Sequence, residues 1–144
     1  MSIMKTLLAI TVALSIAACG PKDDGFNIKG FYADMPPEEF VAVRESLGTF
    51  MLQGFYVDDV ETLDDAEGIV FALRAKGNGD FNRVVDRLTA QYGKPTERDY
   101  KFNSATWWRP TGDGSDQNVA YELSAWKARN NVSIGIWKHP PLPR

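Results

Sequence analysis

Few side chains in this chain could carry out covalent chemistry. The chain contains one cysteine, Cys19, and one histidine, His139, which stands in a proline-rich C-terminal tail. A general base needs a rigid mount, and such a tail does not supply one. The sequence also lacks the motifs typical of serine nucleophiles, phosphate loops and zinc proteases. We therefore expect a protein that is not an enzyme and that uses no cofactor.

Carboxylates are densest in residues 58–67. The candidates there are Asp58, Asp59, Glu61, Asp64 and Asp65. A pair of them could catalyse hydrolysis, but nothing in the sequence buries one to raise its pKa. The spacing does not match an EF-hand, and neither does that of residues 111–118, so we expect no metal site. We interpret residues 58–67 as an exposed acidic turn, which could alternatively block a basic active site in an incoming enzyme.

The four tryptophans are the most informative feature. Residues 119–126 and 132–137 alternate in polarity, and Asn130-Asn131 between them suits a tight hairpin turn. One face of this hairpin is apolar and should meet the helices. The opposite face holds Glu122, Ser124, Trp126, Ser133, Gly135 and Trp137. Trp107 and Trp108 are consecutive, so one of them should point to this second face.

Tryptophans gathered on a sheet face that no helix covers are typical of a binding surface for another protein. We assign partner binding to Trp107, Trp108, Trp126, Trp137, Glu122 and Gly135. Gly135 should leave room beside the rings, and the basic neighbours should be Arg109, Lys127 and Lys138. The alternative, which the sequence leaves equally open, is that the rings cover a strand end or pack under residues 140–143.

The N-terminal residues have the pattern of a signal peptide. Lys5 supplies a positive charge, and residues 6–16 are largely apolar and too short to span a bilayer. Ile16-Ala17-Ala18-Cys19 follows, which resembles the lipobox of Gram-negative bacterial lipoproteins. The resemblance implies cleavage after residue 18 and lipid on Cys19, which would hold the protein on a membrane of the cell envelope. Gly20, where aspartate would favour the inner membrane, resembles the sorting pattern for the periplasmic face of the outer membrane.

The remaining chain divides into a tether, a domain and a tail. We interpret residues 19–27 as a tether, residues 28–139 as a single domain and residues 140–144 as a proline-rich tail. Apolar spacing predicts one helix that follows Asp34 and ends at Gly48, and another that is capped by Asp80 and ends at Gly93. Strands are expected at residues 28–33, 50–57, 68–76, 100–109, 119–126 and 132–137.

This order, β-α-β-β-α-β-β-β, predicts an α+β two-layer sandwich in which two helices cover one face of a mostly antiparallel sheet. Because the only cysteine would carry lipid, no disulfide can form and the fold must depend on burial. The chain has 16 Lys and Arg against 19 Asp and Glu, without a dense basic stripe. Nucleic acid is therefore not an expected partner.

The C-terminal half contains a helix that ends in Tyr92-Gly93-Lys94-Pro95-Thr96, then Phe102, then Thr106-Trp107-Trp108, a loop and two strands. This layout resembles BamE/SmpA-like lipoproteins of the outer-membrane assembly machinery. Met35-Pro36-Pro37-Glu38-Glu39-Phe40 is similar to the helix start of that family, although Asp34 stands where a glycine would be. The resemblance implies a protein that scaffolds or binds other envelope proteins.

Three hypotheses follow. The first is a lipid-anchored envelope protein that binds another envelope protein through its aromatic sheet face. The second is a small inhibitor or immunity lipoprotein that acts through the acidic residues 58–67. The third, which we expect least, is a carboxylate hydrolase.

Overall fold

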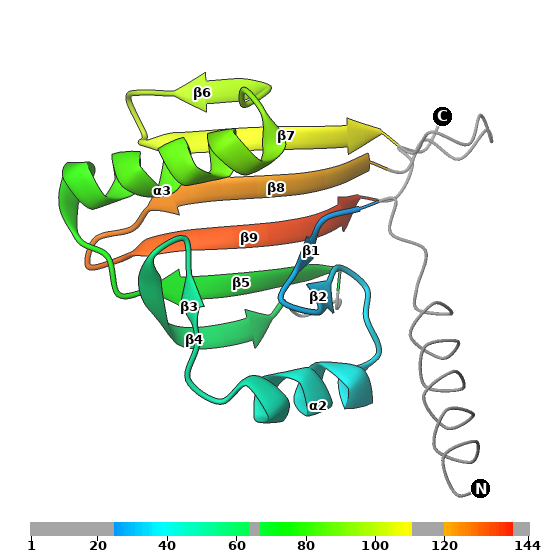
Figure 1. The fold of residues 1–144 in the computed structure, drawn as a ribbon. Helices are drawn as coiled ribbons and strands as arrows, with labels where there is room; N and C mark the ends of the chain where they lie inside the picture. The colour runs from blue at the N-terminus through cyan, green and yellow to red at the C-terminus, as the bar shows by residue number, and fades with distance from the viewer. Residues whose placement is uncertain (1–24, 64–66, 111–119, 140–144) are drawn as a thin grey trace, which may run out of the picture.

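The computed structural model of the chain describes residues 25–63, 67–110 and 120–139. Its elements in chain order are β1 (Asn27–Ile28), β2 (Phe31–Tyr32), α2 (Pro37–Leu47), β3 (Met51–Leu52), β4 (Phe55–Thr62), β5 (Gly68–Leu73), α3 (Gly77–Tyr92), β6 (Glu97–Asp99), β7 (Ser104–Pro110), β8 (Ala120–Lys127) and β9 (Val132–His139). A seven-stranded sheet, a separate β1–β2 hairpin and two helices make up the described fold (Figure 1). The predicted α+β class is therefore confirmed.

The large sheet has the strand order β3-β4-β5-β9-β8-β7-β6, and each pairing between its neighbours is antiparallel. It consists of two meanders, β3 to β5 and β6 to β9, which the chain connects through α3. The meanders join where β5 pairs with β9, with Phe71 opposite Ile134. No connection within a meander is longer than nine residues, which is too few for a parallel crossover, and only the α3 connection is long enough to carry the chain across the sheet.

Helix α3 packs on one face of the sheet over β8, as Figure 1 shows. Its apolar stripe is buried, with Phe81, Val84 and Leu88 fully shielded from solvent. The expected position of Asp80 at the N-cap is wrong, because the helix already begins at Gly77. Asp80 instead lies in the first turn, where its carboxylate accepts a hydrogen bond of 2.8 Å from the backbone N–H of Lys76.

The predicted strand at residues 28–33 is a tight hairpin instead. Lys29 and Gly30 both have positive φ, 56° and 95°, so the chain reverses between β1 and β2. The hairpin carries Phe31 into the core, and α2 packs on it through Phe40, whose ring centroid lies 5.4 Å from that of Phe31. The hairpin and α3 together separate the sheet core from solvent.

The domain also begins earlier than expected. Phe26, which we placed in the tether, is only 3% exposed and makes an edge contact with the ring of Tyr92. Residues 25–27 therefore belong to the domain, and residues 19–24 of the expected tether lie outside the described residues.

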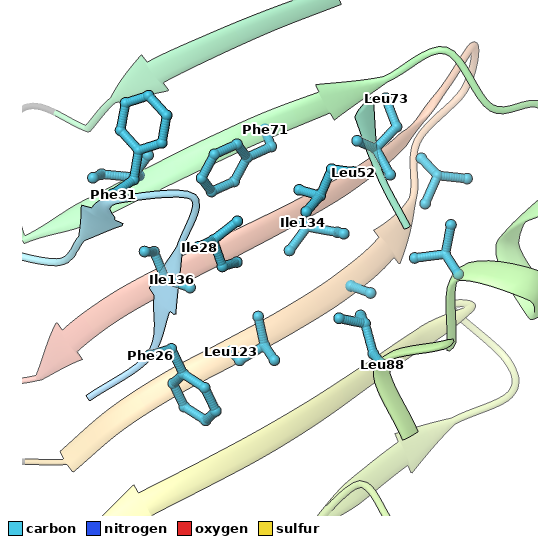
Figure 2. Packing of buried hydrophobic residues seen from close by; sticks show 14 of the residues in the cluster. Phe26, Ile28, Phe31, Leu52, Phe71, Leu73, Leu88, Leu123, Ile134 and Ile136 are labelled. Atoms are coloured by element: carbon cyan, nitrogen blue, oxygen red, sulfur yellow. The ribbon is translucent and has the colours of Figure 1, made fainter. Parts of the chain in front are cut away.

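Figure 2 shows how the core is built between the sheet and the segments that cover it. Phe26, Ile28, Phe31 and Leu88 from the covering segments, and Leu52 from the edge strand β3, pack with Phe71, Leu73, Leu123, Ile134 and Ile136 of the central strands. Each such side chain stabilises the fold by about 1.5–3 kcal/mol when it is fully buried. This burial occurs on one side of the sheet, which leaves the polar positions of the same strands on the other side.

Two further expectations about the strands need correction. The acidic residues from Asp58 to Glu61 lie in β4 rather than in a turn, because the chain turns earlier, at Gln53 and Gly54, whose φ values are positive. His139 ends β9 and pairs with Ala120, so it is held by the sheet and not by a tail. Residues 64–66 and 140–144 lie outside the described residues.

Candidate functional site

The face of the sheet opposite α3 and the β1–β2 hairpin, which we call the open face, consists of rows of cross-strand partners. Partners in a row point to the same side of the sheet. The first row is Asp59, Ala72, Ser133, Trp126, Ser104 and Asp99. The second row is Glu61, Val70, Gly135, Ser124, Thr106 and Glu97. The third row is Gly68, Trp137, Glu122 and Trp108. Apart from its tryptophans, the open face therefore has mostly small side chains in its middle, and it has carboxylates where the first two rows end.

Trp126 and Trp137 form the centre of this face. Their ring centroids are 5.6 Å apart and the ring planes are inclined by 35°. The indole of Trp137 lies flat on the sheet, because its atoms occupy the space where a Cβ at Gly68 or at Gly135 would lie. We expected Gly135 to leave room beside the rings, and the ring of Trp137 fills that room. Both tryptophans remain partly exposed, so each indole presents its outer side to solvent.

A chain of polar contacts runs beside the aromatic pair. The Ser124 hydroxyl donates to Glu122 Oε1 at 2.6 Å and lies 3.0 Å from the Thr106 hydroxyl, which must then be the donor to Ser124. The second carboxylate oxygen of Glu122 lies 2.5 Å from His139 Nε2. Trp108 packs against the His139 ring, with 5.2 Å between centroids.

The order of these contacts bears on catalysis. In a Ser-His-acid triad the imidazole stands between the hydroxyl and the carboxylate, so that it can remove the hydroxyl proton. Here the carboxylate of Glu122 stands between Ser124 and His139. Ser124 is also only 7% exposed. The hydroxyl therefore donates to a partly buried carboxylate, and the imidazole does not contact it.

Charge is divided between the two faces of the sheet. Asp59, Glu61, Glu97, Asp99 and Glu122 belong to the rows of the open face. The cations of the same sheet point the other way: Arg98 stacks on Phe81, Arg109 lies over Phe26, Lys127 bonds Asn78, and Lys138 pairs with Asp34. The expectation that Arg109, Lys127 and Lys138 flank the tryptophan face is therefore wrong. Each directly follows a tryptophan in its strand, so its side chain points to the opposite side of the sheet.

Negative charge at the β4 end of the open face is only partly compensated. Asp58 forms an ion pair with Arg74 at 2.8 Å. The hydrogen bond that protonated Glu61 donates to the Asp59 carboxylate, and then the negative charge of Asp59, raise the pKa of Glu61 above its ordinary value of 4.5. A raised carboxyl pKa means that Glu61 holds its proton more tightly beside this second acid.

Trp107 does not belong to the open face, and its assignment to the partner surface is corrected. It pairs with Leu123, is 3% exposed, and donates from its indole Nε1 to the carbonyl oxygen of Gly93 at 2.8 Å. Trp108 is the member of the pair on the open face, 36% exposed and opposite Glu122. Because successive side chains of a strand alternate, one of the two tryptophans had to point into the core. The register of β7 with β8 makes Trp107 that residue.

The structure also contains an aromatic feature that the sequence analysis missed. Tyr100 and Phe102, in the turn between β6 and β7, are 78% and 68% exposed. We placed both in one long strand, but Asp99 accepts hydrogen bonds from the backbone N–H groups of Lys101 and Phe102 and so closes a turn. Asp99 at the start of this turn and Asn103 at its end were the available signal, since Asp and Asn favour turns.

A hollow of about 500 Å³ between α3 and β6 is lined by Thr89, Lys94, Arg98 and Tyr100, among others. The guanidinium of Arg98 in this hollow already has partners, because it donates to the carbonyl oxygens of Asp99 and Ser104 and stacks on Tyr100. Among the described residues no group of three or more His, Cys, Asp or Glu side chains is placed to hold a metal ion. Among the described residues, the open face is where a pair of partly exposed tryptophans lies on the same surface as several carboxylates.

Cys19 and residues 140–143 lie outside the part of the chain that the structure describes. Within that part, neither helix has the length and apolar character needed to cross a membrane. No protein-family model, no curated protein and no solved structure matches this chain.

Proposed function

We propose that the chain is a lipid-anchored protein of the Gram-negative cell envelope whose domain is a non-catalytic binding module for another envelope protein. The observation that carries the proposal is the partly exposed pair of Trp126 and Trp137 at the centre of the open face, of which Trp137 lies flat on the sheet. Tryptophan is among the residues that contribute most to protein interfaces, and rings already held in place lose little entropy on binding.

The polar groups of the face favour binding over catalysis. Ser124 is bonded to both Glu122 and Thr106, it is buried, and the imidazole of His139 contacts Glu122 rather than Ser124. Such a network holds the strands and the aromatic rings in register without activating a nucleophile. A hydrolase remains the least favoured alternative, and turnover of a cell-wall substrate by the purified chain would support it.

The anchor would place this face close to the membrane. Gly25 lies against the ring of Tyr121, and its carbonyl oxygen accepts a bond of 3.4 Å from Arg109. Tyr121 pairs with Lys138, so the chain enters the domain at the end of the sheet where β9 ends. The residues between Cys19 and Gly25 extend at most about 20 Å. Trp108, Trp137 and His139, at the same end, would lie nearest the lipid surface.

Site-specific photo-crosslinking tests the proposal. The full chain, with its own leader, would be expressed in its host cells with a photoreactive phenylalanine in place of Trp108. A matched control would carry the same group in place of Ala90, an exposed residue of α3. We expect one envelope protein to be crosslinked from position 108 and not from position 90. Absence of any product from position 108, or identical products from both positions, would refute the proposed surface.

The inhibitor hypothesis uses the same surface. Asp59 and Glu61, two of the acids on which it depends, lie on the open face with the tryptophans. A resident partner and an incoming enzyme can therefore be distinguished by when crosslinking occurs. A product that forms in unchallenged cells supports the scaffold, and one that forms only after an external protein is added supports the inhibitor.

A further inference from the structure

We infer that the open face binds an extended segment that carries lysine or arginine side chains. The inference rests on the proposed function, because it names the chemistry of the partner for the same surface. Three features of the open face support it: the division of charge between the faces, the exposed sides of the indoles, and the length of the rows.

The first feature is electrostatic. The first two rows of the open face end in carboxylates at both edges, Asp59 and Glu61 on β4 and Asp99 and Glu97 on β6. Arg98, Arg109, Lys127 and Lys138, the cations of the neighbouring positions, are directed to the helix side. Arg74 is engaged with Asp58. A cationic segment would therefore meet complementary charge at both ends of a row, and an anionic one would be repelled.

The second feature is the aromatic floor between these carboxylates. The face of an indole carries negative electrostatic potential and attracts ammonium and guanidinium groups, and tryptophan does so best among the aromatic residues. Trp137 lies flat, so its outer ring face points away from the sheet, and Trp126 adjoins it at 5.6 Å. A lysine or arginine above the pair would be bound by both rings.

The third feature is size. Neighbouring strands are about 4.8 Å apart, so a row from β4 to β6 is roughly 24 Å long. An extended chain covers that distance with about seven residues. Gly135 lies under the ring of Trp137, and Ser124 and Ser133 are buried, so such a segment would lie on the outer sides of the indoles rather than on the backbone of the sheet.

Peptide binding tests the inference directly. The full lipidated chain would be placed in nanodiscs of zwitterionic lipid, so that the membrane itself does not attract a basic peptide. The probes are an octapeptide of alternating lysine and serine and one of alternating glutamate and serine. Binding would be followed by tryptophan fluorescence, with circular dichroism to check that each variant is folded. We expect the lysine peptide to bind, the glutamate peptide not to bind, and the affinity to fall as sodium chloride is raised.

Matched variants separate recognition by this face from general attraction. Glu61→Gln with Glu97→Gln should weaken binding by about two- to fivefold for each carboxylate, and Trp126→Leu by about two- to fivefold. Glu45→Gln with Asp86→Asn removes the same charge from exposed positions of the two helices and should have no effect. Equal weakening by both double variants would overturn the inference, as would absence of binding to the lysine peptide.

Two further outcomes are informative. If binding of the lysine peptide appears only after residues 140–144 are deleted, the occupant of the face is the chain's own C-terminal segment, and the inference is wrong. If crosslinking from position 108 captures a partner while the lysine peptide does not bind, the proposed function stands and only the partner's chemistry is wrong.

Discussion

The ring of Trp137 lies directly over Gly135, where a Cβ atom at residue 135 would overlap its six-membered ring. Gly68, the cross-strand partner of Trp137, lies under the other end of the same indole. Two glycines on neighbouring strands therefore make a flat seat for one tryptophan. The seat holds the ring parallel to the sheet and beside Trp126, which is the arrangement that the proposed binding face requires.

Gly135→Ala should displace Trp137 and destabilise the fold. An added methyl group meets the indole in a well-packed region, and such overpacking costs about 1–3 kcal/mol. Urea unfolding of the purified chain measures the change, and tryptophan fluorescence should report a more solvated ring. Gly79→Ala is the control, because nothing lies near a Cβ at that helical position, and it should stabilise the protein by about 0.4–1 kcal/mol. Unchanged stability in Gly135→Ala would contradict the flat placement of Trp137.

Trp107→Phe and Trp108→Phe should have different effects although the residues are adjacent. Trp107 is buried and donates to the Gly93 carbonyl oxygen, so its replacement leaves a buried acceptor without its partner and costs about 1–3 kcal/mol. Trp108 is 36% exposed, and its replacement should change the free energy of unfolding by about 0.5 kcal/mol or less. Equilibrium unfolding of the two variants would decide, and the reverse order would mean that the register of β7 with β8 is wrong.

The Asp59–Glu61 pair should make stability depend on pH. Because the pKa of Glu61 is raised in the folded protein, the folded state binds its proton more tightly than the unfolded state does. Stability is therefore greater below the ordinary pKa of 4.5 and is lost as the pH rises through the raised value. Melting temperatures measured from pH 4 to pH 7 should show this loss in the wild type. Glu61→Gln should lack it, and an identical profile in both proteins would exclude the coupling.

Cys19→Ser should release the protein from the membrane. The proposed anchor is lipid on the Cys19 sulfur, and serine at this position cannot form the thioether. Labelling cells with radioactive palmitate and separating membrane from soluble fractions measures both properties. Lys22→Gln, just beyond the lipobox, serves as the control and should remain labelled and membrane-bound. Retention of label by Cys19→Ser would mean that the lipid is attached elsewhere.

Local patterns in the sequence predicted several elements correctly, for physical reasons. The stripe from Phe81 to Leu88 recurs with the period of a helix, and α3 buries that stripe. Alternation in residues 119–126 and 132–137 predicted that Trp126 and Trp137 share a face, because successive side chains of a strand point to opposite sides. Both results depend only on residues that are close together in the chain.

What depends on pairing between distant strands was decided by the tertiary structure alone. Alternation placed either Trp107 or Trp108 on the open face, and only the register of Trp108 with Glu122 selected Trp108. His139 looked like part of a tail because a proline follows it, yet pairing with Ala120 extends β9 to include it. Glu61 and Glu97 lie on the open face, whereas Arg98 and Lys138 point to the helix side. This placement on opposite faces also depends on which side of each strand meets the core. A strand has the same alternation in either orientation, and burial against partners far along the chain determines which of its sides becomes a surface.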